Sequence, residues 1–192
     1  MSTTSPSVQA TAAAVAQDGF EVLDACHRQT IVMLGKLAAL VTGLDRTPPD
    51  RPTRATAGEI VKFFSTTARQ HHEDEELHVF PQLQNSPDPE IVQAVLRLQQ
   101  DHRWMDVDWR ELSPALAAVA ADQGGYDLEA LREGVEIFIA LSNDHIELEE
   151  SCIYPQARTR LKSTERQEMG REMAERRHAR SAAPAGTAGK PQ

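Results

Sequence analysis

An eleven-residue segment occurs twice in this sequence with the same spacing of histidine and glutamate. Residues 71–81 read HHEDEELHVFP, and residues 145–155 read HIELEESCIYP. Their alignment places His71 on His145 and Glu75 on Glu149, and both segments end in an aromatic residue followed by proline. A histidine and a glutamate four residues apart lie on one face of a helix. Two such helices can direct two imidazoles and two carboxylates toward the same point.

The repeat extends to the segments that precede these motifs. LDACHR at residues 23–28 resembles LQQDHR at residues 98–103, which pairs His27 with His102. His27 lies 44 residues before His71, and His102 lies 43 residues before His145. The chain therefore reads as a duplicated helical hairpin, with one histidine on the first helix of each copy and His-x-x-x-Glu on the second.

Apolar residues recur at intervals of three and four, which predicts four long helices and no strand. We expect the first over about residues 20–44, and the second to open at Thr56, where Thr56-Ala-Gly-Glu59 is a capping-box pattern. Asp88 and Asp127 are the expected N-caps of the third and fourth helices. Pro114 should kink the third helix or end its regular part.

Four long helices with short connections predict an all-α fold, an up-down-up-down four-helix bundle built from the duplicated hairpin. The bundle should occupy residues 18–162. Residues 1–17 have no apolar period and are expected to form a disordered N-terminal arm. A short C-terminal helix is expected over residues 163–178, followed by a disordered tail at 179–192 that is rich in alanine, glycine and proline.

The composition narrows the classes of partner. The 20 basic and 29 acidic residues give a formal charge of −9, which disfavours nucleic acid and anionic membranes. No apolar run has the length of a membrane span, and residues 1–17 lack the pattern of a secretory signal. Cys26 and Cys152 show no zinc-type spacing. These features predict a cytoplasmic protein with two reduced thiols.

The expected bundle places four histidines and two glutamates at one level of its core. They are His27, His71, Glu75, His102, His145 and Glu149. Two buried carboxylates close together are very costly unless a cation neutralises them, and imidazole and carboxylate are ligands for divalent metals. The alternative is that His27 and His102 are ordinary core histidines and that both glutamates face water. Six residues in one repeated frame favour the metal site.

These motifs resemble those of the hemerythrin-like proteins of the HHE cation-binding family. The resemblance covers about residues 20–160. The matching residues are His27, His71-His72-Glu73, Glu75, Phe80-Pro81, Asp101-His102, His145, Glu149 and Tyr154-Pro155. It implies a four-helix bundle around two iron ions in a non-haem, oxo- or hydroxo-bridged di-iron centre. Glu75 and Glu149 would bridge the irons and the four histidines would be terminal ligands, although Mn or Zn would also suit these residues.

One departure from the family bears on function. Oxygen-carrying hemerythrins have a fifth histidine one turn after the position of His102, where this chain has Asp106. Four histidines, two bridging carboxylates and one bridging oxygen fill about ten of the twelve positions of two octahedral metals. The remaining positions are expected to bind O2, peroxide or nitric oxide, for handling or sensing oxidative and nitrosative stress. This leaves reversible binding, catalytic turnover and sensing open.

Two alternatives involve no turnover. The chain is either a sensor whose iron occupancy orders the bundle for an unidentified protein partner, with residues 163–178 as the contact, or an iron donor for iron-sulfur repair. Repair proteins of this family usually carry a cysteine in an N-terminal segment, and residues 1–17 contain none. A ferritin-like site based on Glu75-x-x-His78 and Glu175-x-x-His178 is discounted, because the second motif adjoins the expected tail.

Several further residues lie near the predicted site. His72 is about 100° around the helix from His71 and is expected at the surface or behind the ligands, the alternative being that it replaces His71 as the ligand. His78 and Cys152 are expected to fill the core, or else to act as extra ligands or a gate. Glu76 and Glu150 belong to an acidic face that could orient ligand imidazoles. A dry pocket is expected from Leu98, Met105, Phe138 and Leu141, with Trp109 as a wall, and Cys26 could form a redox pair with Cys152.

Overall fold

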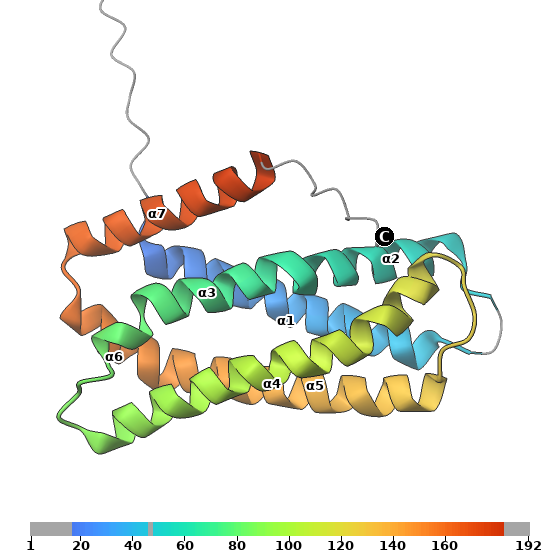
Figure 1. Ribbon diagram of the computed structural model, residues 1–192, viewed down its shortest axis with the longest axis horizontal. Coiled ribbons are helices and arrows are strands. Elements are labelled where there is room, and N and C mark those ends of the chain that lie inside the picture. The colour runs from blue at the N-terminus through green and yellow to red at the C-terminus, as the bar shows by residue number, and fades with distance from the viewer. Residues whose placement is uncertain (1–16, 46–47, 183–192) are drawn as a thin grey trace, which may run out of the picture.

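The computed structural model describes residues 17–45 and 48–182, and within these ranges all the regular structure is helical. Helical rods run side by side along the long axis of the molecule, and α7 (Ser163–Ala182) lies on their outside (Figure 1). The α-helices are α1 (Gly19–Gly43), α2 (Arg51–Lys62), α3 (Arg69–His78), α4 (Pro89–Ala120), α5 (Leu128–Leu148), α6 (Tyr154–Arg160) and α7 (Ser163–Ala182). The shorter elements are η1 (Phe63–Ala68), η2 (Phe80–Gln82) and η3 (Glu149–Ile153). The predicted four-helix bundle is confirmed.

The rods alternate in direction, because each connection joins neighbouring ends of the bundle (Figure 1). α1 packs against α2 and α5, and α4 packs against the same two helices. α2, η1 and α3 form one continuous rod, and α5, η3 and α6 form another. This arrangement brings the second helix of each predicted hairpin into a shared interior.

Aspartate side chains start the rods. Asp88 and Asp127 cap α4 and α5 as expected, and Asp18 caps α1. The expected capping box at Thr56 is wrong. Asp50 accepts a hydrogen bond from the Thr53 backbone at 2.8 Å, so α2 begins at Arg51, with Pro52 in its first turn. Proline is tolerated there because the first-turn N–H groups have no partner inside the helix.

Two segments of the rods are wound as π-helix. η1 ends three residues before His71, and η3 begins at Glu149. Wide turns of this kind occur frequently at functional sites, and they change the direction in which side chains point relative to a regular α-helix. Pro114 does not end α4, because the helix continues through it to Ala120.

Two apolar cores lie on either side of the predicted ligand residues. One contains Leu37, Ile60 and Leu116, and the other contains Phe20, Leu98 and Ile153. Each of these side chains is nearly or fully buried. The buried polar side chains therefore occupy a layer of the bundle that is closed off by hydrocarbon at both ends.

α7 packs on the outside of the bundle against α1 and α3 (Figure 1). Its Met169 and Met173 are buried in the second apolar core. The backbones approach closely at Gly170, where an added Cβ would lie 1.9 Å from the Gln17 carbonyl oxygen. α7 extends to Ala182, beyond the expected end at residue 178. The rest of the expected tail and residues 1–16 of the expected arm lie outside the described residues.

No helix within residues 17–45 and 48–182 is long and apolar enough to cross a membrane.

Candidate metal centre

The six residues predicted from the repeat meet in the polar layer of the bundle. His27 comes from α1, His102 from α4 and His145 from α5, while α3 supplies His71 and Glu75, and η3 begins with Glu149. All six are buried, and the most exposed of them, His102, is only 7% exposed. Residues far apart in the chain thus converge at one enclosed place.

The six side chains form two overlapping groups of four. One group is His27, His71, Glu75 and Glu149, and the other is Glu75, His102, His145 and Glu149. Within each group the potential ligand atoms all lie within 4.8 Å of one another. The two glutamates belong to both groups. Carboxylates can bridge cations through their two oxygens, so the arrangement could hold two neighbouring metal ions.

The distances follow the internal repeat. His71 Nε2 lies 3.3 Å from Glu75 Oε1, and the equivalent His145 Nε2 lies 3.2 Å from Glu149 Oε1. The other two histidines approach the glutamate of the opposite hairpin. His27 Nε2 is 3.2 Å from Glu149, and His102 Nε2 is 3.4 Å from Glu75. Each glutamate is therefore shared between the two halves of the protein.

Several polar atoms of this cluster have no hydrogen-bond partner among the described residues. They include both carboxylate oxygens of Glu149, Oε2 of Glu75 and Nδ1 of His71. Nε2 of His102 and Nε2 of His145 face each other at 3.1 Å. Buried polar groups in native proteins are usually satisfied. Orphaned carboxylate oxygens beside converging imidazole nitrogens are what a cation site needs, so the donor set fits metal ions.

Two partly exposed carboxylates lie beside Nδ1, the outer ring nitrogen, of two of the imidazoles. Glu150 Oε1 lies 3.0 Å from Nδ1 of His27, and its repeat equivalent Glu76 lies 3.1 Å from Nδ1 of His102. A carboxylate on one ring nitrogen fixes the tautomer and leaves the other nitrogen free for a metal. The expectation that these acidic residues could orient ligand imidazoles agrees with the geometry.

The internal repeat is not kept at Nδ1 of the other two imidazoles, His71 and His145. Asp101 Oδ2 lies 3.8 Å from Nδ1 of His145. The repeat position of Asp101 is occupied by Cys26, and Nδ1 of His71 has no hydrogen-bond partner within the described part of the chain. Burial and the charge of Glu75 raise the pKa of Cys26 to about 12. A protonated, buried thiol is a poor nucleophile, and both cysteines are free, which gives no support to the redox pair.

The charges of the cluster are strongly coupled. Burial and the neighbouring charge of Glu149 raise the pKa of Glu75. Burial would also raise the pKa of Glu149, but His145 and His27 hold it well below its usual value. Burial would lower the pKa of His145, but Glu149 and Asp101 raise it to about 10. Protons therefore balance the buried carboxylates when no cation does.

The position of His72 bears on the site, because its side chain is half-buried and lies beside the predicted ligands. Its ring stacks on His102, with centroids 4.1 Å apart and planes 16° apart. Burial and the charge of His102 lower the pKa of His72 well below its usual value. His72, His102 and His145 also bring one nitrogen each within 4.8 Å of one another.

Other expected site residues point elsewhere. His78 accepts a hydrogen bond from Arg176 of α7 at 2.9 Å and faces away from the cluster. Cys152 is half-buried against the second apolar core. Trp109 is buried and donates a hydrogen bond to Ser65 at 3.0 Å. This fixed position agrees with its expected place in the wall of the pocket. Asp106 is paired with arginines.

A small enclosed cavity of about 20 Å³ adjoins the cluster. His27, His71, His72 and His145 line it together with apolar residues that include Met105 and Phe138. A space of this size holds about one water-sized molecule. Of the expected pocket residues, Met105 and Phe138 line it, whereas Leu98 belongs to the second apolar core and Leu141 packs on the first.

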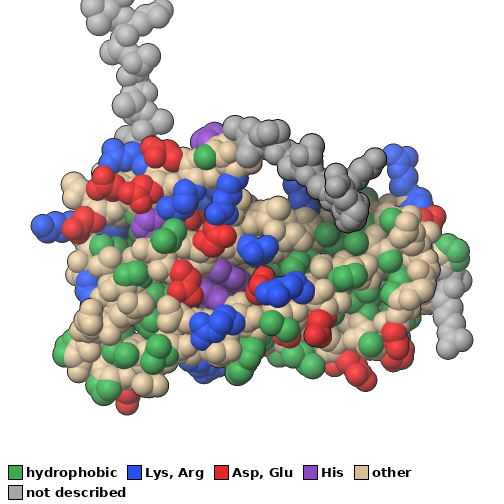
Figure 2. All heavy atoms as spheres, viewed as in Figure 1, with side chains coloured by type: hydrophobic (Ala, Val, Ile, Leu, Met, Phe, Trp, Pro, Cys, Tyr) green, Lys and Arg blue, Asp and Glu red, His purple; other side chains and the backbone are tan. Residues whose placement is uncertain are grey.

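A larger surface groove of about 460 Å³ lies outside this cavity. Its lining includes Phe64, His72, His102, Met105 and Trp109, with charged residues at its edge. Histidine side chains are visible on this face between α3 and α4, bordered by acidic and basic side chains (Figure 2). The groove connects the histidine cluster with solvent.

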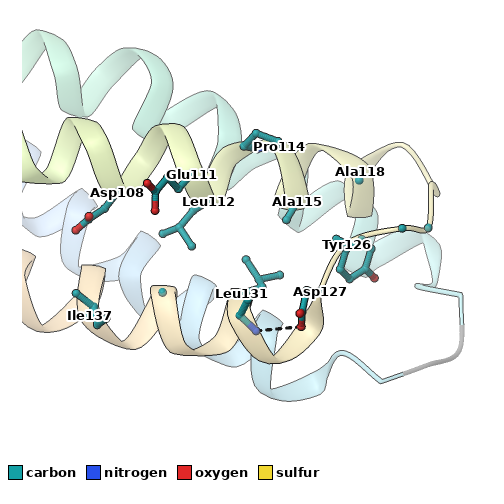
Figure 3. Close-up of a pocket in the computed structure, with 14 residues that line it drawn as sticks. Asp108, Glu111, Leu112, Pro114, Ala115, Ala118, Tyr126, Asp127, Leu131 and Ile137 are labelled. Atoms are coloured by element: carbon teal, nitrogen blue, oxygen red, sulfur yellow. Dashed lines mark hydrogen bonds between the residues drawn. The ribbon is translucent and has the colours of Figure 1, made fainter.

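A pocket of about 510 Å³ at the far end of the bundle has a different character (Figure 3). It lies between α4 and α5, where Leu112 and Leu131 point toward each other (Figure 3). Its carboxylates come from Asp108, Glu111 and Asp127, and no histidine is among its lining residues within the described chain. Asp127 is already the N-cap of α5. This pocket lacks the imidazole set of the central cluster.

The fold and the cluster define a class of protein: a helical bundle with a buried histidine and carboxylate set suited to metal cations. The model of the hemerythrin HHE cation-binding domain matches residues 18–157, and the chain belongs to this family. An uncharacterized protein of Haemophilus influenzae is 29% identical over 157 residues, which cover 82% of this chain and 88% of that protein. The family resemblance drawn from the sequence is confirmed.

Proposed function

We propose that this protein binds two iron ions between its two hairpins and uses them to interact with O2, peroxide or nitric oxide. The observation that carries the proposal is the pair of four-residue groups that share Glu75 and Glu149. When bound, a non-haem di-iron centre supplies one-electron redox chemistry and open coordination positions for such small molecules. The proposed ligands are His27, His71, Glu75, His102, His145 and Glu149.

The surroundings suit a small, uncharged ligand. The adjoining cavity holds about one water-sized molecule and is walled by Phe64, Met105 and Phe138 together with the imidazoles. Apolar walls exclude bulk water, which favours a diatomic molecule or peroxide over a larger charged substrate. The Tyr154 hydroxyl lies 3.2 Å from Nε2 of His27 and donates its hydrogen to Glu75, so it orients residues of the proposed centre.

The first test is the metal content and optical spectrum of protein purified without chelator and then exposed to air and peroxide. We expect close to two irons per chain and near-ultraviolet bands that change on exposure. Glu149→Ala should lose both while the helical circular dichroism persists. Glu147→Ala is the matched control, because Glu147 is exposed and precedes the shared carboxylate by two residues. A single zinc with a silent spectrum would contradict the proposal.

A second candidate function, sensing of iron occupancy without turnover, is favoured by the contacts of α7. Asp74 lies on α3 between His71 and Glu75 and pairs with Arg176 and Arg177 of α7, at 2.6 and 2.7 Å. A change in the order of α3 on iron binding would therefore alter its contacts with α7. If the iron-loaded and metal-free proteins showed equal protease sensitivity and equal thermal midpoints, this candidate would be rejected.

A further inference from the structure

We infer that His72 supplies a third imidazole to the metal held by His102 and His145, so that the two metal positions are unequal. This inference rests on the proposed two-metal function and refines the coordination of that site. The question arises because the chain has Asp106 at the place where oxygen carriers of the family have a fifth histidine. Three residues are candidates for an added ligand: Asp106, His78 and His72.

Asp106 is already engaged outside the cluster. Its carboxylate accepts a hydrogen bond from Arg110, one turn further along α4. Its other oxygen lies 3.6 Å from the guanidinium of Arg69. Asp106 lines the outer groove, and the enclosed cavity beside the histidines does not include it. A carboxylate held by two arginines at the groove edge is poorly placed to reach the buried metal positions.

His78 is engaged with α7. Its Nε2 accepts the hydrogen bond from Arg176 and lies 3.7 Å from Glu172. Both partners belong to α7, on the outer side of α3. His78 therefore serves the packing of the external helix rather than the interior.

His72 reaches the interior from the residue next to His71. Its ring centroid lies 4.1 Å from that of His102 and 5.7 Å from that of His145. One nitrogen of each of these three imidazoles falls within the 4.8 Å expected of groups that share a cation. The position of His72 therefore suits a ligand of the same metal ion as His102 and His145.

The repeat shows that this ligand has no counterpart in the other half. The residue equivalent to His72 is Ile146, which is buried. The group around His27 and His71 therefore has two imidazoles, and the group around His102 and His145 has three. The metal with fewer ligands is the one left open to a small molecule. Of the described histidines, His72 also lines both the outer groove and the enclosed cavity.

Cobalt(II) provides a readout that does not depend on activity. In the Co(II)-loaded protein, each bound imidazole gives one strongly shifted, solvent-exchangeable N–H proton resonance, so the number of coordinated histidines can be counted by NMR. We expect five such resonances and two Co(II) per chain. In His72→Phe, which keeps a ring of similar size on His102, we expect four resonances and a weaker affinity for one of the two ions, by roughly tenfold or more. His78→Phe makes the same change on the same helix and should keep all five.

The outcomes separate this inference from the proposed function. Two bound ions with four resonances, unchanged in His72→Phe, would overturn the third imidazole and leave the two-metal proposal standing. Fewer than two ions in the wild-type protein would overturn both. The wild-type count is decisive even if His72→Phe fails to fold.

Discussion

The Tyr154 hydroxyl donates a hydrogen bond to Oε1 of Glu75, which ties the end of one hairpin to the shared carboxylate of the other. The Tyr154 ring also stacks on His27, with centroids 5.2 Å apart. Its repeat equivalent Phe80 stacks on His102 at 5.5 Å and has no hydroxyl. Burial and the nearby carboxylates raise the pKa of Tyr154 well above its usual value, so the phenol remains a donor. The two halves of the site therefore differ by one buried hydrogen bond.

Tyr154→Phe should destabilise the metal-free protein, because it removes the donor and leaves a buried carboxylate oxygen of Glu75 without it. A lost buried partner of this kind costs about 1–3 kcal/mol. Urea unfolding followed by circular dichroism measures the change. Phe80 provides a natural comparison for a ring without a hydroxyl in the same packing. An unfolding free energy equal to that of wild type would show that the hydrogen bond contributes nothing net.

Glu150→Ala should weaken metal binding while leaving the proposed ligands in place. Glu150 holds Nδ1 of His27 and is itself half exposed, so its loss frees the imidazole without opening a cavity. Loss of such a supporting carboxylate typically costs 10–100-fold in metal affinity. Competition with a coloured chelator measures this affinity. Glu147→Ala removes an exposed carboxylate from the same helical segment and should have little effect, and an equal loss in both variants would point to net charge instead of orientation.

The sequence was sufficient to predict the four-helix bundle and the residues that converge in it. This was possible because the i, i+4 spacing of His71 and Glu75 fixes their shared face, and the repeat supplies the second hairpin. Features that depend on packing between distant elements were not predictable. Asp74 is buried and paired with arginines of α7, and nothing in its own segment of the sequence indicates this contact. Helical geometry places His72 about 100° around the helix from His71, but only the folded chain shows that its ring stacks on His102.

The metal-free protein should lose stability as the pH rises from 7 to 10. In the folded state the pKa of His145 is raised to about 10, and in the unfolded chain it is about 6.5. The folded state therefore binds the proton more tightly, so this contribution is fully present below about pH 6.5 and disappears as the pH rises through about 10. Urea midpoints measured across this range test the prediction. His145→Gln should give a flatter profile, and a wild-type midpoint that rises with pH would contradict it.

Asp74→Asn should loosen α7 from the bundle. Asp74 is only 3% exposed, and its two carboxylate oxygens accept hydrogen bonds from Arg176 and Arg177. The neutral amide cannot hold both guanidinium groups, so we expect a loss of about 1–3 kcal/mol and faster amide hydrogen exchange along residues 163–180. Glu73→Gln is the matched control, since Glu73 pairs with Arg180 of the same helix at an exposed position, where an ion pair contributes at most about 1 kcal/mol. Hydrogen exchange followed by mass spectrometry resolves the two variants. If α7 exchanged equally slowly in Asp74→Asn and wild type, then Met169 and Met173 alone would suffice to hold the helix. The ion pairs between α7 and the ligand-bearing helix α3 would then not couple the two helices.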